Sequence, residues 1–127
     1  ELERAQATLK AAQLCLREHL YDSAANRAYF AAFQAAICAI ESRNIQREEW
    51  SHKNVHGDFV HFFVRRQKVV SASIVSTLPK LMQLRHVADY KQPGVSQIQA
   101  ERAVRLAQEF IELIAREILH ASETQKF

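Results

Sequence analysis

A run of small and apolar residues from Asp22 to Ile40 is the feature that most constrains the fold of this chain. Eight of the seventeen residues from Ala24 to Ile40 are alanine. Alanine has the highest helix propensity and lets a neighbouring helix approach closely. A helix that is apolar on nearly every face lies in the interior of a protein. The run therefore predicts a central, buried helix.

Three polar side chains interrupt this apolar run, namely Asn26, Arg27 and Gln34. Arg27 cannot lose its charge, because the pKa of a guanidinium lies above about 12. A buried Arg27 would need a charged partner, a route to water or a ligand. We therefore look for function around Arg27.

Periodic patterns predict the remaining elements. Leucines and alanines spaced three or four apart predict an amphipathic helix from about residue 2 to about residue 20. Asp22 is a suitable N-cap for the second helix, which reaches about residue 42. The patterns further predict a third helix that ends near residue 67 and is capped by Ser51 or Asn54. They predict a fourth helix over about 74–91, which starts near Leu78 or bends at Pro79. The last predicted helix begins at a Ser96–Gln99 capping box.

Length and composition favour one all-α domain. A chain of 127 residues fits a single domain, 1–127, that can bury a core without disulfides or a metal. Only two glycines and two prolines leave few turns, so we predict an antiparallel up-and-down bundle of four to five helices. The net charge of +3 is compatible with an acidic partner such as RNA but does not decide for one.

The cysteines and the hydropathy pattern suggest a cytoplasmic location. Cys15 and Cys38 form no CxxC pair and are expected as free thiols in a reducing compartment. The chain has no secretory signal and no uncharged apolar run of about 18 residues, so no membrane partner is expected.

Several motifs, in order, resemble one known family. The segment Leu20-Tyr-Asp-Ser-Ala-Ala-Asn-Arg-Ala-Tyr-Phe-Ala-Ala-Phe33 resembles a motif of the HEPN superfamily (higher eukaryotes and prokaryotes nucleotide-binding domain), in its branch of small stand-alone prokaryotic proteins. Arg85-His-Val-Ala-Asp-Tyr90 resembles the second motif of that branch, Arg-x-x-Ala-Asp-Tyr. The Ser51-His-Lys segment and the Val95-Ser pair also fit. The similarity covers essentially the whole chain.

This resemblance implies an all-α bundle, commonly a homodimer, with a link to nucleotides or RNA. Many relatives are metal-independent ribonucleases of toxin–antitoxin, anti-phage or CRISPR systems, and others are encoded beside a minimal nucleotidyltransferase, which would be a partner here. Nuclease branches carry an arginine followed four to six residues later by a histidine, but the fifth residue after Arg85 is Tyr90. A formal match, Arg47 to His52, falls in the loop before the third helix.

The motif residues allow an architectural and a functional interpretation. In the first, a buried Arg27 pairs with Asp89 of the fourth helix, although Arg85, at i and i+4, competes for the same carboxylate. In the second, a polar groove binds a phosphate through its arginines, and a tyrosine stacks on a base or donates a hydrogen bond. The residues predicted to line this groove are Asn26, Arg27, Arg85, Asp89 and Tyr90.

Two function classes remain open from the sequence. If the protein cleaves RNA, Arg85 would hold the scissile phosphate, and His86 or Tyr90 would transfer the proton without a metal. Otherwise the bundle is a non-catalytic binding or scaffolding module. His52 and His56 have the i, i+4 spacing of zinc ligands, but no third ligand is evident nearby, so no metal and no cofactor are expected.

Overall fold

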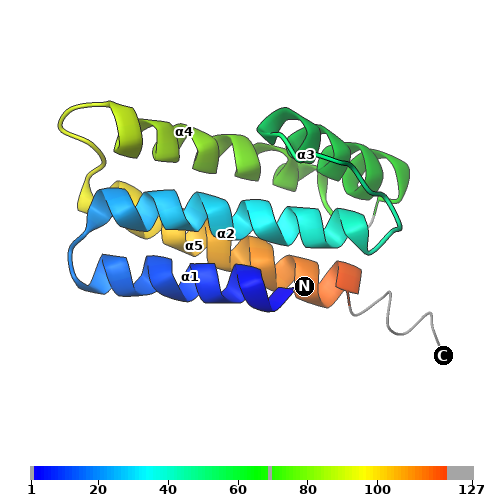
Figure 1. The fold of residues 1–127 in the computed structure, drawn as a ribbon, viewed down its shortest axis with the longest axis horizontal. Helices are drawn as coiled ribbons and strands as arrows, with labels where there is room; N and C mark the ends of the chain where they lie inside the picture. The colour runs from blue at the N-terminus through cyan, green and yellow to red at the C-terminus, as the bar shows by residue number, and fades with distance from the viewer. Residues whose placement is uncertain (1, 69, 120–127) are drawn as a thin grey trace.

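The computed structural model of the protein describes residues 2–68 and 70–119. Those residues form an all-α bundle without β-strands, as the sequence predicts (Figure 1). Its α-helices are α1 (Leu2–Arg17), α2 (Tyr21–Glu41), α3 (His52–Phe59), α4 (Thr77–Tyr90) and α5 (Gln97–Leu113). A π-helical segment, Val60–Arg66, extends α3, another, Ile114–Leu119, extends α5, and a 3-10 turn, Ala72–Ser76, precedes α4.

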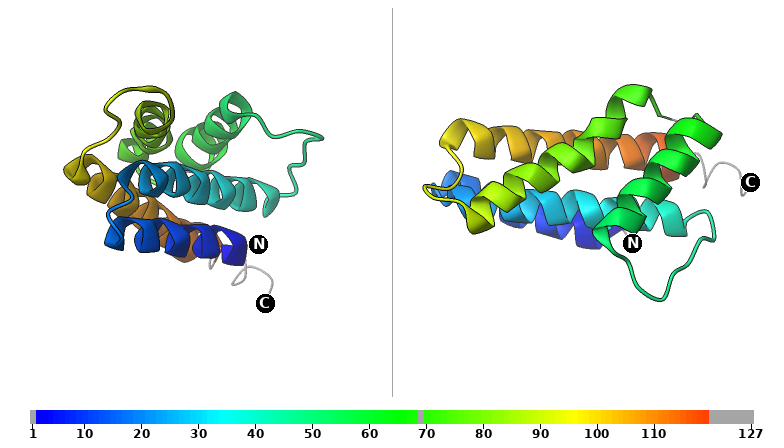
Figure 2. Two further views of the ribbon diagram at one scale, coloured as in Figure 1. Left: turned by 60° about the vertical axis from the view of Figure 1, so that its left-hand side comes forward. Right: turned by 90° about the horizontal axis from the view of Figure 1, so that it is seen from above.

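Helix α2 is the centre of the bundle. It contacts each of the other four α-helices, with α1 and α5 on one side and α3 and α4 on the other (Figures 1 and 2). All eight alanines between residues 24 and 40 are fully buried, together with Tyr29 and Ile40. Small side chains allow several helix axes to approach α2 closely, which is why the alanine-rich segment occupies this position. The prediction of a central helix is confirmed.

One stripe of α2 nevertheless reaches the surface. The stripe consists of residues three or four positions apart, the spacing of a single helix face. Its members are the half-buried Asn26, Phe30 and Phe33 and the exposed Arg27. The expectation of a helix buried on nearly every face is therefore wrong for this stripe. The helices packed around α2 leave this face open between α1 and the α3–α4 pair, and the polar side chains of the motif lie on it.

Two of the predicted helix starts are confirmed. The Ser51 hydroxyl accepts a hydrogen bond from the Asn54 backbone N–H at 3.0 Å and caps α3. Ser96 and Gln99 form the reciprocal capping box of α5, with bonds of 3.1 and 2.8 Å. Both caps involve residues three positions apart, so the local sequence suffices to specify them.

The predicted capping role of Asp22 is wrong. Helix α2 begins at Tyr21, and Asp22 instead accepts a hydrogen bond from the Val95 backbone N–H at 2.9 Å. Its carboxylate thereby fixes the turn that precedes α5, where Gly94 has a φ of +91°. The fourth helix begins at Thr77, so Pro79 lies in its first turn, where a missing N–H breaks no helical hydrogen bond.

The aromatic core lies where α3 and its π-helical extension meet α5. Phe59, Phe63 and Phe110 are buried and have ring centroids 5.1 to 5.2 Å apart in successive contacts. Phe62 is only partly buried. Cys15 and Cys38 are partly buried free thiols. Among the described helices, none is long and apolar enough to cross a membrane.

Candidate functional site

Four polar side chains from α2 and α4 form a continuous hydrogen-bonded chain, which we call the arginine cluster. Arg27 donates from Nε and Nη2 to Asn26 Oδ1, at 3.0 and 2.6 Å. The Asn26 amide nitrogen donates to both carboxylate oxygens of Asp89, at 3.2 and 3.0 Å. Arg85 Nε donates to Asp89 Oδ2 at 2.9 Å. Asn26 thus uses both ends of its amide to connect an arginine to a carboxylate.

The ring of Phe30 lies against both guanidinium groups of the arginine cluster. Its centroid is 5.4 Å from Cζ of Arg27 and 5.1 Å from Cζ of Arg85. Both distances are within the range of about 6 Å for cation–π contacts. Phe30 is one turn after Asn26 on the open stripe of α2, so its ring emerges beside the cluster. Two arginines from different helices therefore meet at one aromatic ring.

The arginine cluster keeps an excess of positive charge. The side chains of Arg85 and Asp89 are only 18% and 24% exposed, although the backbone of Asp89 leaves that residue as a whole at the surface. Asp89 lies in the last turn of α4, where the helix dipole disfavours a carboxylate, so Arg85 and Asn26 stabilise its charge. Within residues 2–68 and 70–119, no carboxylate lies within ion-pair distance of Arg27, and no hydrogen bond uses the terminal nitrogens of Arg85. The Arg27 guanidinium and the terminal nitrogens of Arg85 are therefore available to an anion.

The sequence left the partner of Asp89 open between Arg27 and Arg85, and its expectation of a buried Arg27 is wrong. Arg27 is exposed and is held by Asn26, whereas Asp89 pairs with Arg85. The reason is the open stripe of α2, which lets the guanidinium of Arg27 reach water. Arg85 lies one turn before Asp89 on the same helix and needs no cross-helix approach to pair with it.

The structure separates the other two predicted site residues from the arginine cluster. His86 and Tyr90 are both exposed, and their rings contact each other with centroids 5.1 Å apart. Tyr90 is 67% exposed. Neither residue contacts Arg85 or Asp89 through a hydrogen bond in the described part of the chain. Both therefore occupy a neighbouring face of α4.

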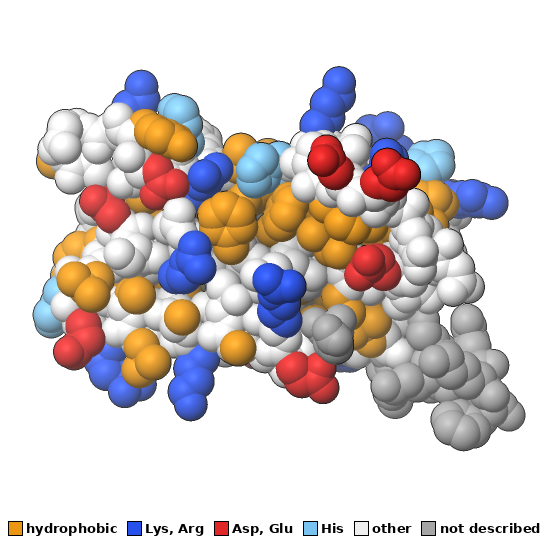
Figure 3. Space-filling model, viewed as in Figure 1, with side chains coloured by type: hydrophobic (Ala, Val, Ile, Leu, Met, Phe, Trp, Pro, Cys, Tyr) orange, Lys and Arg blue, Asp and Glu red, His pale blue; other side chains and the backbone are white. Residues whose placement is uncertain are grey.

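An open hollow of about 380 Å³ adjoins the arginine cluster. It is lined by Cys15, Asp22, Ser23, Asn26, Arg27 and Asp89. Because two carboxylates line it, hydroxyl or amino donors suit this hollow better than an anion does. Figure 3 views the molecule as in Figure 1, and on this face basic, acidic, histidine and apolar side chains lie close together.

A second cluster lies beside the first, and we call it the histidine cluster. It consists of Tyr29, which is fully buried on α2, with His52 and His56 of α3. The Tyr29 hydroxyl lies 2.6 Å from His52 Nδ1 and 2.9 Å from His56 Nε2. A phenol has one proton, so the hydroxyl donates to one imidazole and accepts from the other. The ring of His52 also packs on Phe33, at 5.0 Å between centroids.

Burial favours the uncharged forms of all three side chains in the histidine cluster. Burial lowers the pKa of His52, and the nearby Arg85 charge lowers it further. Burial lowers the pKa of His56 as well, with a smaller contribution from His52. Burial raises the pKa of the Tyr29 phenol well above its usual value, against a small opposing effect of Arg85. Arg85 therefore links the two clusters electrostatically.

The other histidine hypotheses receive no support from the geometry. His52 and His56 direct the ring nitrogens named above at the same hydroxyl, and no group of three histidine, cysteine or acidic residues that could hold a metal exists among residues 2–68 and 70–119. Arg47, the arginine of the formal nuclease match, forms a bidentate ion pair with Asp58 at 2.8 and 3.0 Å. Its guanidinium is thus engaged with a carboxylate of α3.

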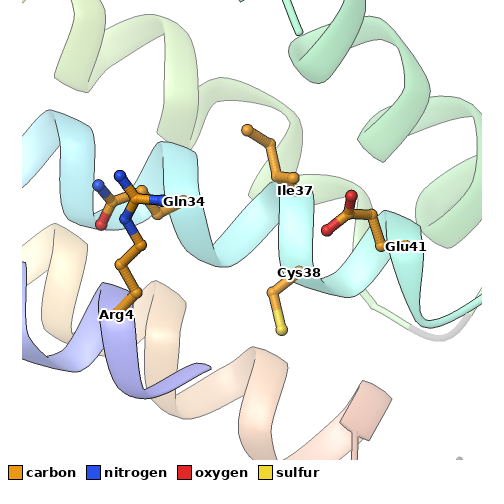
Figure 4. A pocket seen from close by; sticks show the side chains of 5 residues that line it. All are labelled: Arg4, Gln34, Ile37, Cys38 and Glu41. Atoms are coloured by element: carbon orange, nitrogen blue, oxygen red, sulfur yellow. The ribbon is translucent and has the colours of Figure 1, made fainter. Parts of the chain in front are cut away.

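A smaller hollow of about 130 Å³ lies between α1 and α2 (Figure 4). Arg4 of α1 faces it together with Gln34, Ile37, Cys38 and Glu41 of α2. Gln34 of α2 accepts a hydrogen bond from the Thr8 hydroxyl at 2.7 Å. With one cation and one carboxylate, this hollow has no charge excess comparable to that of the arginine cluster.

A family model described as the HEPN domain matches residues 1–118 of the chain. The chain belongs to the HEPN domain family. Membership confirms the resemblance found in the sequence and supports a general role connected with nucleotides or RNA. HEPN domains commonly dimerise. No curated protein matches the sequence.

The HEPN motifs led sequence reasoning to the arginine cluster but not to the histidine cluster. Tyr29 belongs to the quoted motif, yet on an alanine-rich helix its phenol was indistinguishable from a core aromatic. The i, i+4 spacing of His52 and His56 was the available signal, but it was weighed only as a zinc-ligand spacing without a third ligand. Their common partner is 23 residues away from His52 on another helix, so the cluster of this HEPN domain became visible only in the fold.

Proposed function

We propose that this HEPN domain binds a phosphate group of a nucleotide or of RNA at the arginine cluster. One observation carries the proposal. Two guanidinium groups from different helices meet at the ring of Phe30, and of these two only Arg85 forms an ion pair within the described residues, with Asp89. Planar guanidinium groups bind phosphate oxygens in pairs of hydrogen bonds, and the terminal nitrogens of Arg85 are not used within the described residues.

The surroundings suit the other parts of a nucleotide. The hollow beside Asp22, Ser23 and Asp89 offers acceptors for ribose hydroxyls or for the amino group of a base. Phe30 and Phe33 are half-buried aromatic side chains on the same stripe of α2, and a base can stack on a ring of this kind. Tyr90, which we predicted as a stacking residue, remains a candidate from its exposed position on α4.

Binding is tested by fluorescence anisotropy with a short labelled single-stranded RNA in EDTA. We expect Arg27→Ala to weaken binding about tenfold or more, because a charge-assisted hydrogen bond contributes about 1.5–3 kcal/mol. The slope of log affinity against log salt should also fall by about 0.7, one phosphate contact on a single strand. Arg105→Ala removes an equal charge from an exposed position on α5 and is the matched control. Equal losses in both variants would refute a specific site.

Cleavage remains a second candidate for the same site. The sequence-based assignment uses Arg85 to hold the phosphate and His86 to transfer the proton, and the cluster leaves the terminal nitrogens of Arg85 available for that role. End-labelled RNA incubated with the protein in EDTA tests it, with Arg85→Ala and His86→Ala beside the wild type. Cleavage that both variants abolish would support the assignment. Intact RNA would leave a non-catalytic binding module.

The biological setting follows from the family rather than from the site. We propose a cytoplasmic homodimer in a toxin–antitoxin or defence-type system, with a minimal nucleotidyltransferase as a partner. The resemblance of the two motifs to the small stand-alone branch supports this setting. Light scattering of the purified protein tests the dimer. Co-purification with the product of an adjacent nucleotidyltransferase gene tests the partner.

A further inference from the structure

We propose that His52 is a third phosphate-binding residue of the arginine cluster, and that it takes up a proton when the bound phosphate carries two negative charges. The site would then prefer a terminal phosphate, a phosphomonoester, over the internal phosphodiesters of an RNA strand. This inference rests on the proposed phosphate binding and specifies its ligand.

The geometry around Phe30 supports a third cationic position. The His52 ring centroid lies 6.3 Å from the Phe30 ring, which also contacts Arg27 and Arg85. One aromatic ring of α2 is therefore surrounded by two permanent cations and one imidazole, from α2, α4 and α3. His52 itself is half-buried rather than fully enclosed.

Tyr29 occupies one ring nitrogen of His52 and leaves the other for a ligand. Nδ1 lies 2.6 Å from the buried hydroxyl, so Nε2 is on the far side of the imidazole ring. No hydrogen bond within residues 2–68 and 70–119 uses that Nε2. It is therefore the atom that can donate a proton to a phosphate oxygen.

The histidine cluster accommodates both protonation states of His52. When His52 is charged, Nδ1–H donates to the Tyr29 oxygen, and the Tyr29 hydroxyl donates in turn to His56 Nε2. Each partner keeps its hydrogen bond, because the phenol both accepts and donates. The groups that face His52 are Tyr29 from α2, Arg85 from α4 and His56 from its own helix.

Charge balance explains why the added proton would select a terminal phosphate. The side chains of the arginine cluster together carry one positive charge, which a monoanionic phosphodiester neutralises; Asp22, which lines the adjoining hollow, accepts from the Val95 backbone N–H. A phosphomonoester carries close to two negative charges above pH 7, since its second pKa is about 6. The second negative charge offsets the effect of Arg85 that disfavours protonation of His52. Binding of the dianion should then be linked to uptake of about one proton.

The test compares a short single-stranded RNA carrying a 5′-phosphate with the same RNA carrying a 5′-hydroxyl. Calorimetry in two buffers of different ionisation enthalpy, at about pH 7.5, should give uptake of about one proton for the phosphorylated RNA and about none for the other. From about pH 7 to about pH 8.5, affinity for the phosphorylated RNA should fall by up to about tenfold per pH unit. Equal proton uptake or equal pH slopes for the two RNAs would overturn the proposal.

Variants assign the proton to His52. His52→Gln retains a polar group for the Tyr29 hydroxyl, and it should remove both the proton uptake and the preference for the 5′-phosphate. His61→Gln removes an exposed histidine of the π-helical extension and should leave both unchanged. If neither RNA binds in an Arg27-dependent manner, the proposed function itself fails. If both RNAs bind alike and depend on Arg27, only the role of His52 fails.

Discussion

Replacing Tyr29 by phenylalanine isolates the contribution of the histidine cluster to stability. The Tyr29 side chain is fully buried, and its hydroxyl bonds His52 at 2.6 Å and His56 at 2.9 Å. A neutral hydrogen bond contributes about 0.5–1.5 kcal/mol net, and a buried partner left without a bond costs about 1–3 kcal/mol. His52 can regain a bond from water more readily than the more deeply buried His56. We therefore expect Tyr29→Phe to lower the free energy of unfolding by about 2 kcal/mol.

Urea unfolding followed by circular dichroism measures this change. With a slope of about 2 kcal/mol per molar urea, the midpoint should fall by about 1 M without a change in slope. Tyr21→Phe is the matched control, because the Tyr21 hydroxyl also has two side-chain partners. It lies 2.9 Å from Nδ1 of His19 and donates to Gln97 at 3.1 Å. Those bonds lie at the surface, where water replaces them, so the control should lose less than about 0.5 kcal/mol. Equal losses in the two variants would refute the reasoning.

Three further predictions concern the turn before α5, the arginine cluster and the histidine cluster. Gly94→Ala should lower the urea midpoint by an amount equivalent to about 1–3 kcal/mol. The reason is that Gly94 has a φ of +91° and an added Cβ would lie 2.5 Å from the Asp22 carboxylate. An unchanged midpoint would contradict this packing. Asp89→Asn should destabilise the protein more than Arg27→Ala does, because the asparagine leaves the largely buried side chain of Arg85 without its counter-charge. Thermal unfolding of the two variants tests which of them is less stable. Folding lowers the pKa of both histidines in the histidine cluster below the unfolded value of about 6.5. The free energy of unfolding should therefore reach its highest level above that pH and decrease as the pH falls below it. Urea midpoints from about pH 7.5 to about pH 5 measure this loss, which His56→Gln should reduce.

Sequence reasoning reached part of the candidate site through motif and spacing. Arg85 and Asp89, one turn apart, were expected to share a helix face, and they form an ion pair at 2.9 Å. Asn26 was placed in the same groove and does bind Asp89. Whether the groove binds phosphate remains a prediction. The partner of Asp89 was left open between Arg27 and Arg85, because the sequence gives no measure of how α2 is rotated against α4.

The sequence by itself determined those features that depend on neighbours within one or two helical turns. The alanines from 24 to 40 specified a helix around which others pack closely, and Ser51 and the Ser96–Gln99 box specified where two helices begin. Helix propensity, capping and i, i+4 pairing all act over these short distances, so residue order alone encodes them.

Only the tertiary structure decided which face of α2 stays open and which side chains meet across helices. The rotation and spacing of the packed helices brought Arg27 to the surface, directed Asp22 to the turn before α5, and placed the Tyr29 hydroxyl between two histidines of α3. These contacts join residues more than 20 positions apart. Their energies depend on distances of a few ångströms between separate helices, which the periodicity of a single helix does not contain.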